Sequence, residues 1–221
     1  MPTASENRAA LQLVTGTAVD TAVATLSGTR GAPEARRLAL LDTVPELIGY
    51  FSEGSAALAV DFYEEERELA GVRGRVFTTE LTLVDRTVKI RRGIAWASQP
   101  LFDGADDVAA QRLAEVVQLE TARPYRDTIL ANRSRDPEAV GWRRISAGGC
   151  KFCRMLADKG AVYRHDTARF AAHENCHCTA QPVFGVNDTG EEASAMQYLA
   201  SKRRRTPAER AALASYLADH Y

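Results

Sequence analysis

The residues best suited to chemistry are four cysteines, all of which lie between Cys150 and Cys178. Two residues separate Cys150 from Cys153 and one separates Cys176 from Cys178, with 22 residues between the two pairs. Cysteines with two residues between them can direct both sulfurs at one ion from a turn, and a second pair arriving from a distant strand completes a tetrahedron. Because zinc favours such soft ligands, this spacing predicts a structural zinc site.

Five donors are available to this site, although four would suffice, and the sequence leaves open which four bind. The candidate ligands are Cys150, Cys153, His173, Cys176 and Cys178. In an extended Cys176-His177-Cys178 the two sulfurs share one face and the intervening ring points away. We therefore rank His177 below His173 as a ligand.

Three other interpretations of the cysteines remain open. The side chains could be small buried hydrophobes without a metal. A redox or disulfide role is a second interpretation, but Cys150-Lys-Phe-Cys153 lacks the preceding strand of a thioredoxin motif. A nucleophilic pair such as Cys150 with His173 is a third, but no orienting group or oxyanion site accompanies it.

The elements that must position these donors lie in residues 136–185, which we interpret as a Cys/His-rich α+β module. We expect extended segments at 142–146, 161–164 and 179–184, and a short helix over 151–159 that Gly160 ends. Pro182 places the last strand at a sheet edge or strand end. The larger apolar side chains expected to pack around the cysteines are Trp142, Phe152, Met155, Leu156 and Tyr163.

Residues 1–135 are rich in helix formers and predict a helical assembly region. We expect helices over about 11–26, from Pro33 with a kink or break at Pro45, and over 54–69, which Gly71 ends. An extended crossing or short strand at 75–84 precedes a helix over 85–98 and a helix over 106–123 that Pro124 interrupts. The fold class is therefore α+β and mainly α-helical.

The third predicted region, residues 186–221, is a linker followed by a helix over 206–220. Thr206 is a suitable N-cap for that helix and Pro207 a suitable first residue. A basic run that could contact packaged DNA or a partner lies beside it: Lys202, Arg203, Arg204 and Arg205.

Composition excludes several classes of protein. The 221 residues carry a net charge of −1, which argues against a dedicated nucleic-acid coat, and four cysteines are too few for a disulfide-built scaffold. The first residues do not resemble a signal peptide, and we recognise no apolar run of the ~20 residues that a membrane helix needs. We expect no membrane contact and a reducing cytoplasm as the place of synthesis.

Three stretches within residues 141–183 carry a family resemblance: Gly141-Trp-Arg-Arg-Ile-Ser, Gly149-Cys-Lys-Phe-Cys-Arg-Met-Leu-Ala-Asp-Lys-Gly-Ala-Val-Tyr and His173-Glu-Asn-Cys-His-Cys-Thr-Ala-Gln-Pro-Val. They resemble the C-terminal segment of the MuF-like phage head-morphogenesis proteins, and especially the minor capsid proteins of tailed phages that infect actinobacteria. The helix-forming run at 59–72 is also similar to a helix that the family carries upstream. The resemblance implies a component of the procapsid or virion interior that acts with the portal, present in the host cytoplasm during assembly.

The function that follows from this resemblance is that of a minor capsid or head-morphogenesis protein, with scaffold or major capsid protein as further partners. The alternative is a prohead maturation protease, because similar actinophage proteins often carry that label. Several serines and histidines are present, but their positions suggest no catalytic set. We therefore expect an assembly protein in preference to an enzyme.

Overall fold

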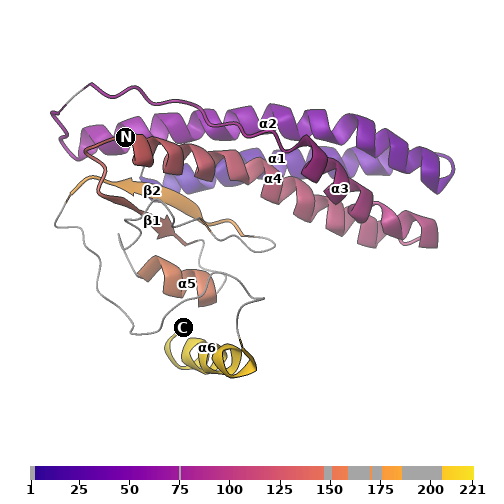
Figure 1. Cartoon of the computed structure of the whole chain (residues 1–221). Coiled ribbons are helices and arrows are strands. Elements are labelled where there is room, and N and C mark those ends of the chain that lie inside the picture. Colours follow the sequence, from indigo (N-terminus) through magenta and orange to yellow (C-terminus); the bar gives the residue numbers. More distant parts are fainter. Residues whose placement is uncertain (1–2, 75, 147–150, 159–169, 171–175, 186–205) are drawn as a thin grey trace.

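The computed structural model in Figure 1 is mainly α-helical, with a small antiparallel sheet at one end of three long helices, as the composition predicts. It describes residues 3–74, 76–146, 151–158, 170, 176–185 and 206–221. The long helices are α1 (Ala4–Gly28), α2 (Pro33–Leu69) and α4 (Asp106–Arg135), and each packs against the other two.

Helices α1 and α2 begin and end where local chemistry dictates. The Thr3 side chain caps α1 by accepting a hydrogen bond from the Glu6 N–H, while the Glu6 carboxylate accepts one from the Thr3 N–H. Pro33 occupies the start of α2, where its missing N–H costs nothing. Gly71, at a φ of 65°, follows the end of α2 in a left-handed conformation that favours glycine.

Of the kink or break predicted at Pro45, the break is wrong, because α2 continues through Pro45 and joins the second and third expected helices into one, while the kink stays a prediction. A proline inside a helix leaves the carbonyl four residues earlier without its usual donor. Here that carbonyl belongs to Leu41, and the Arg91 side chain donates to it at 2.7 Å. A side chain from another helix thus satisfies the group that Pro45 leaves open.

Helix α4 likewise continues through Pro124, where an interruption was predicted. This helix packs against α1, α2 and α3 (Thr87–Ala97), and its residues Thr121, Pro124 and Tyr125 are buried. Its fit between neighbouring helices explains the continuity, since tertiary burial routinely outweighs the local preference against proline.

Residues 76–86, which we call the strap, form an extended crossing and not a strand. The Asn132 side chain accepts from the Glu80 N–H at 2.9 Å and donates to the Glu80 carbonyl at 2.9 Å, and Thr128 accepts from the Thr82 N–H at 3.0 Å. Side chains of α4 therefore provide the hydrogen bonds that a neighbouring strand would supply.

The strap leads into α3 (Thr87–Ala97), which is followed by the short helix η1 (Gln99–Asp103). Helix α3 packs closely on α4 at Gly93, where a Cβ atom would lie 3.0 Å from a methyl carbon of Val116. Arg86 at the start of α3 forms a bidentate ion pair with Glu120 of α4: its Nε and Nη2 atoms donate to the two carboxylate oxygens at 2.6 and 3.0 Å. These contacts fix both the strap and α3 on the long helices.

The sheet consists of β1 (Gly141–Ile145) and β2 (Thr179–Val183), paired antiparallel with Trp142 opposite Pro182. Trp142 and Ala180 lie in the same buried cluster as Phe62 and Tyr125 of the long helices. The sheet therefore shares its core with the helical region, while the predicted domain boundaries at 135/136 and 185/186 stay predictions.

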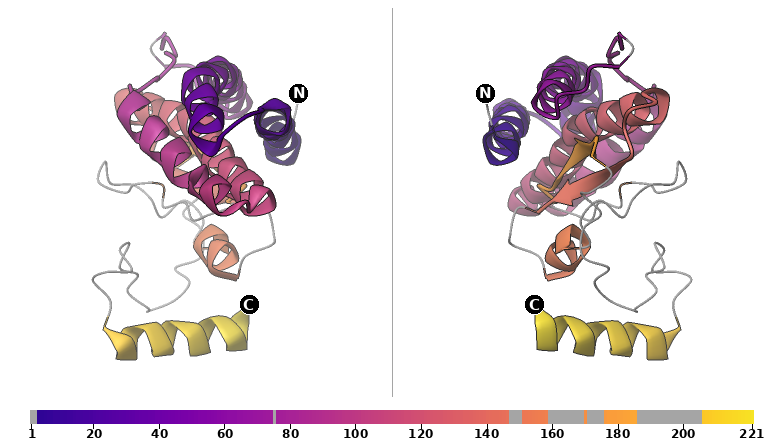
Figure 2. Two further views of the ribbon diagram at one scale, coloured as in Figure 1. Left: turned by 90° about the vertical axis from the view of Figure 1, so that its right-hand side faces the viewer. Right: turned by 90° about the vertical axis from the view of Figure 1, so that its left-hand side faces the viewer.

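The two remaining helices are α5 (Lys151–Asp158) and α6 (Pro207–His220). Thr206 caps α6 through a reciprocal pair of bonds with Glu209, and Pro207 is its first residue, as predicted. Figure 2 shows α6 beside α5, on the side away from the long helices. The predicted Gly160 terminator and the strand at 161–164 lie outside the described residues.

By length and composition alone, α1 is apolar enough to cross a membrane. Buried helices of folded cores share this property. In this structure one face of α1 is buried against α2 and α4, through residues at helical spacing such as Leu11, Ala18, Ala22 and Leu26. The expectation that no stretch is apolar enough for a membrane helix is therefore wrong for α1, although one of its faces packs on the other helices, and the absence of membrane contact stays a prediction.

Candidate metal centre

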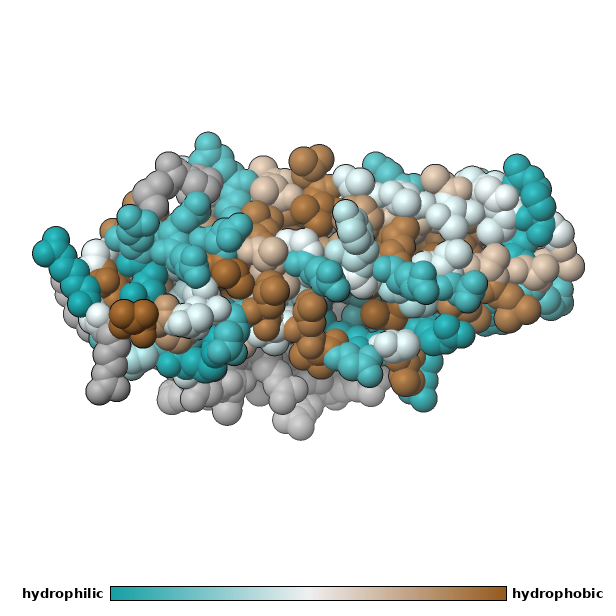
Figure 3. Space-filling model, turned by 90° about the horizontal axis from the view of Figure 1, so that it is seen from above, coloured by the Kyte–Doolittle hydropathy of each residue, from teal (hydrophilic) through white to brown (hydrophobic). Residues whose placement is uncertain are grey.

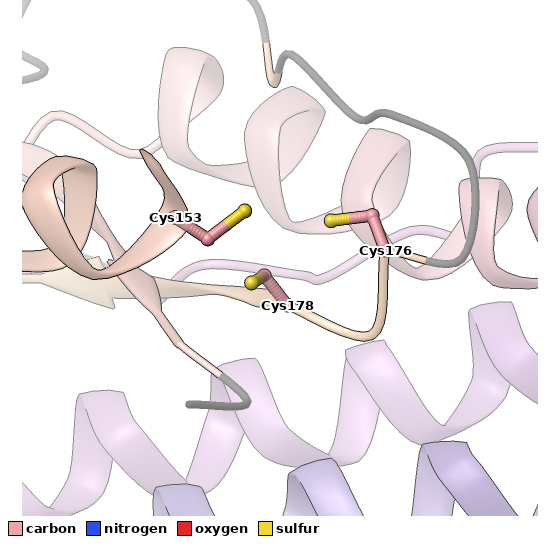
Figure 4. A group of neighbouring side chains, drawn as sticks. All are labelled: Cys153, Cys176 and Cys178. Atoms are coloured by element: carbon pink, nitrogen blue, oxygen red, sulfur yellow. The ribbon is translucent and has the colours of Figure 1, made fainter. Parts of the chain in front are cut away.

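Three of the cysteines meet in one buried cluster between α5 and the segment that leads into β2. Cys153 lies on α5, and Cys176 and Cys178 precede the first residue of β2. Their Sγ atoms all lie within 4.8 Å of one another, and each residue is 1–2% exposed. Figure 4 shows the Cys153 and Cys176 sulfurs pointing toward each other, with Cys178 beside them.

Of the five predicted donors, the structure brings these three together, and Cys150 and His173 lie outside the described residues. His177 is described and is not a member of the cluster, as the alternation of an extended Cys-His-Cys segment predicts. Burial lowers the pKa of its imidazole and so favours the neutral ring. Three thiols therefore lie close enough together to bind one ion, and the fourth ligand stays a prediction.

Two side chains of α4 hold the backbone of the Cys176–Cys178 segment. Arg126 donates from Nε to the Cys178 carbonyl at 3.1 Å and from Nη2 to the Cys176 carbonyl at 2.7 Å. The Gln118 amide donates to the same Cys176 carbonyl at 3.0 Å. Because Arg126 and Gln118 are themselves buried, these bonds fix where the two sulfurs lie relative to α4.

A second buried arginine faces the sulfurs directly. Arg144 of β1 is 2% exposed, and its Nη1 lies 3.9 Å from the Sγ atoms of both Cys153 and Cys176. The guanidinium groups of Arg144 and Arg126 also lie over the ring of Phe170, at 3.8 and 4.9 Å from its centroid. The cluster thus has two positive charges within its immediate surroundings.

These surroundings separate the proton affinities of the thiols. Hydrogen bonds from the Cys153 and Cys178 thiols lower the pKa of Cys176, and the charge of Arg126 acts in the same direction. The pKa of the Cys153 thiol is raised, because this thiol donates hydrogen bonds to Cys176 and Cys178 and because it is buried. Burial in turn lowers the pKa of Arg126, although the charge of Cys176 opposes that effect. The cluster therefore favours at least one thiolate, the form that binds metals.

The donor set fits zinc. In a tetrahedral zinc–thiolate centre the sulfurs lie about 3.8 Å apart, because each Zn–S bond is about 2.3 Å long. The observed limit of 4.8 Å leaves room for a small adjustment as an ion enters. A group of three thiolates with a fourth donor carries a negative charge, which Arg126 and Arg144 would offset. A buried arginine beside two of the sulfurs, Arg144, and a second one bonded to the carbonyls of Cys176 and Cys178, Arg126, argue against the interpretation of these cysteines as simple hydrophobes.

A disulfide role gains no support from the described cysteines, all three of which are free thiols. The cysteine–histidine nucleophile pair would involve Cys150 and His173, which lie outside the described residues. Among the expected packing residues, Trp142, Met155 and Leu156 are buried and Phe152 packs against the cysteines, while Tyr163 is not described.

Sequence reasoning missed the arginines and the glutamine around the cluster. One signal was available, because Gln118 and Arg126 are eight residues apart and so share a face of α4. That face is otherwise buried, and a buried arginine requires an anion or carbonyl partner. Nothing in the local sequence, however, indicates that the partner is the Cys176–Cys178 segment.

Comparison with known proteins assigns the chain to a protein family. The VG15 protein family matches residues 2–202, which is most of the chain. The chain belongs to the VG15 protein family. It is a family of phage proteins, so the phage origin that the sequence resemblance implied is supported at this level. No curated protein shows a significant match to the chain, and neither does any solved structure.

The VG15 family match includes the long helices, the sheet and the cysteine cluster, but ends before α6. The helical region and the cluster are therefore matched together. Helix α6 lies beyond the matched range.

Proposed function

We propose that this VG15-family protein is a minor capsid or head-morphogenesis protein that acts with the portal during procapsid assembly. The observation that carries the proposal is the cysteine cluster, which joins α5 and the β2 entry segment under α4. A zinc ion bound here would be structural: it would hold α5 and the β2 entry segment together. A fixed arrangement of these elements suits a protein whose role is to bind partners. The phage family and the resemblance at residues 141–183 support the same role.

The buried position of the cysteines favours this role over catalysis at the cluster. Cys153, Cys176 and Cys178 are 1–2% exposed, and the side chains of Arg126 and Phe170 pack around them. A catalytic nucleophile must reach its substrate, whereas a structural metal centre is closed by its own ligands. The cluster thus has the character of a structural site.

In the proposed role the protein is made in the host cytoplasm and enters the procapsid interior, with scaffold or major capsid protein as further neighbours. The basic run at residues 202–205 would contact packaged DNA. That run lies outside the described residues, so its support is the sequence alone.

The experiment that tests the proposal is assembly in cells infected by a phage that lacks this gene. Supplying the intact chain should restore procapsids that contain it together with portal protein, and Cys153→Ser should fail because the cluster region loses its structure. Arg123→Ala, on an exposed part of α4, is the matched control and should restore assembly. Normal heads without the protein would contradict the proposal. Defined cleavage of capsid proteins that depends on one serine or histidine would establish the protease alternative instead.

A further inference from the structure

The outer edge of the strap has free backbone groups. The inward groups of Glu80 and Thr82 are bonded to α4, and in an extended chain the alternate residues direct their groups to the opposite side. Those alternate residues are Leu81 and Leu83, whose N–H and C=O groups make no hydrogen bond within the described part of the chain. The strap therefore presents an unpaired edge like that of an outer β-strand.

The same segment exposes large apolar side chains. Leu81, Leu83, Val84 and Val88 are 53%, 49%, 58% and 65% exposed. Figure 3, which views this side of the molecule, shows hydrophobic residues gathered near its middle with hydrophilic residues around them. Single exposed apolar residues are ordinary, but four within eight positions beside an unpaired edge are typical of a protein-binding surface.

A positively charged pocket lies where the strap enters α3. It has a volume of about 360 Å³ and is lined by Asp85, Arg86, Val88, Lys89 and Arg92. The Asp85 carboxylate accepts from the Thr87 N–H at 2.9 Å. Glu120 pairs with Arg86 and lies 3.6 Å from Lys89, so one carboxylate serves two cations. Arg92 is exposed and has no ion-pair partner among the described residues, which leaves the pocket with an excess of positive charge.

We propose that the strap edge and this pocket bind an extended, acidic and apolar segment of a partner protein. The segment would add as a β-strand to the free groups of Leu81 and Leu83, cover the apolar side chains, and place a carboxylate beside Lys89 and Arg92. Main-chain pairing would supply affinity, and the charge complementarity would select an acidic sequence. This proposal concerns a surface far from the cysteine cluster in the sequence, and it does not depend on the head-assembly function.

Duplex DNA fits these observations less well than a peptide does. Phosphates would pair with Lys89 and Arg92, but DNA offers nothing to the unpaired edge or to the four apolar side chains. Asp85, which also lines the pocket, would repel a run of phosphates more than it would repel one carboxylate.

The test uses the full chain and a short synthetic peptide of alternating valine and threonine that ends in two aspartates. Amide shifts in the NMR spectrum should change at residues 79–92 as the peptide is added. Lys89→Glu with Arg92→Glu should weaken binding by at least about tenfold, because the pocket charge reverses. Arg210→Glu on α6 is the matched control and should leave the affinity unchanged.

A peptide with N-methylated backbone amides tests the pairing itself, because it cannot donate to the strap. It should bind at least about tenfold more weakly than the unmodified peptide. Equal binding of the two peptides, absence of binding, or shift changes elsewhere on the chain would overturn the proposal. A DNA duplex that displaces the peptide from these residues, or self-association of the chain through the strap, would also overturn it.

Discussion

Two interiors of this protein are built from different side chains. Between α1, α2, α3 and α4, a cluster of twelve buried apolar residues includes Val44, Ile48, Leu113 and Val117. Around α5 the corresponding cluster consists of three cysteines, with Phe152 and Phe170 packed against them. Burial of leucine and valine side chains contributes about 1.5–3 kcal/mol each, whereas a cysteine contributes far less area. The helical region can therefore be stable by burial alone. The cysteine region depends on hydrogen bonds from α4, and a metal bound by its thiols would add to its stability.

The largest expected effect would separate the two interiors. Chelation of zinc, or Cys153→Ser, should remove stabilisation on the order of 10 kcal/mol from the cysteine region, since a structural zinc ion supplies that much. Hydrogen exchange should then show loss of protection in α5 and in the Cys176–Cys178 segment, while α2 and α4, and the sheet that packs on them, stay protected. Metal analysis of the full chain should show about one zinc per chain before chelation.

The matched controls for this prediction also identify the fourth ligand. His177→Ala should keep the metal, because His177 is not in the cluster. Whichever of Cys150→Ser and His173→Ala abolishes zinc binding marks the remaining ligand. If the chain is fully folded without metal, the cysteine region needs no zinc, and the proposed difference between the two interiors is wrong.

A cavity in the apolar interior tests the other side of the comparison. Leu113→Ala should lower the free energy of unfolding by about 3 kcal/mol, because Leu113 is 1% exposed within the helical core. Thermal or denaturant unfolding measures this loss. The zinc content of the folded variant should remain that of the original chain, and a parallel loss of zinc would mean that the two interiors are one cooperative unit.

The contact between the interiors runs through Arg126. Arg126→Met should cost about 2 kcal/mol, because it removes donors from two buried carbonyls. It should also weaken zinc affinity by about 10–100-fold, as loss of a supporting contact does in other metal sites. A competition titration with a coloured chelator measures the affinity. Arg123→Met, on an exposed part of the same helix, is the control, and an equal effect from both variants would argue against a positioning role.

The smallest expected effect is on the pH dependence of the free energy of unfolding, and it involves Glu120 in the helical region. Burial disfavours its charge, but the hydrogen bonds and charges of Arg86 and Lys89 outweigh that cost and lower the pKa of Glu120. A lowered folded-state pKa adds stability above the unfolded value, and that stability is lost as pH falls through the folded value. Glu120→Gln should therefore cost about 1 kcal/mol at pH 7 and little in strong acid, as measured by unfolding across pH. A difference that does not vary with pH would mean that charge is not the cause.

Helix identity and the gathering of Cys153, Cys176 and Cys178 could be predicted from local residues, while helix continuity could not. Thr206 and Pro207 correctly marked the start of α6, and the spacing of Cys176 and Cys178 correctly separated them from His177. Pro45 predicted a kink or break, but α2 continues through it, and the donor that bonds to the Leu41 carbonyl, Arg91, is 50 residues away along the chain. A local pattern cannot contain a partner that only packing brings near.

By itself, the sequence determined the helical composition of the chain, the caps, the alternation that places two sulfurs on one face, and the phage resemblance. Tertiary structure alone decided that α2 and α4 continue through their prolines, that Asn132 and Thr128 hold the strap, and that Arg126 and Arg144 surround the cysteines. The physical reason is the range of each effect. Caps and alternation act over a few residues, whereas a buried polar group takes its partner from whichever segment the fold places beside it.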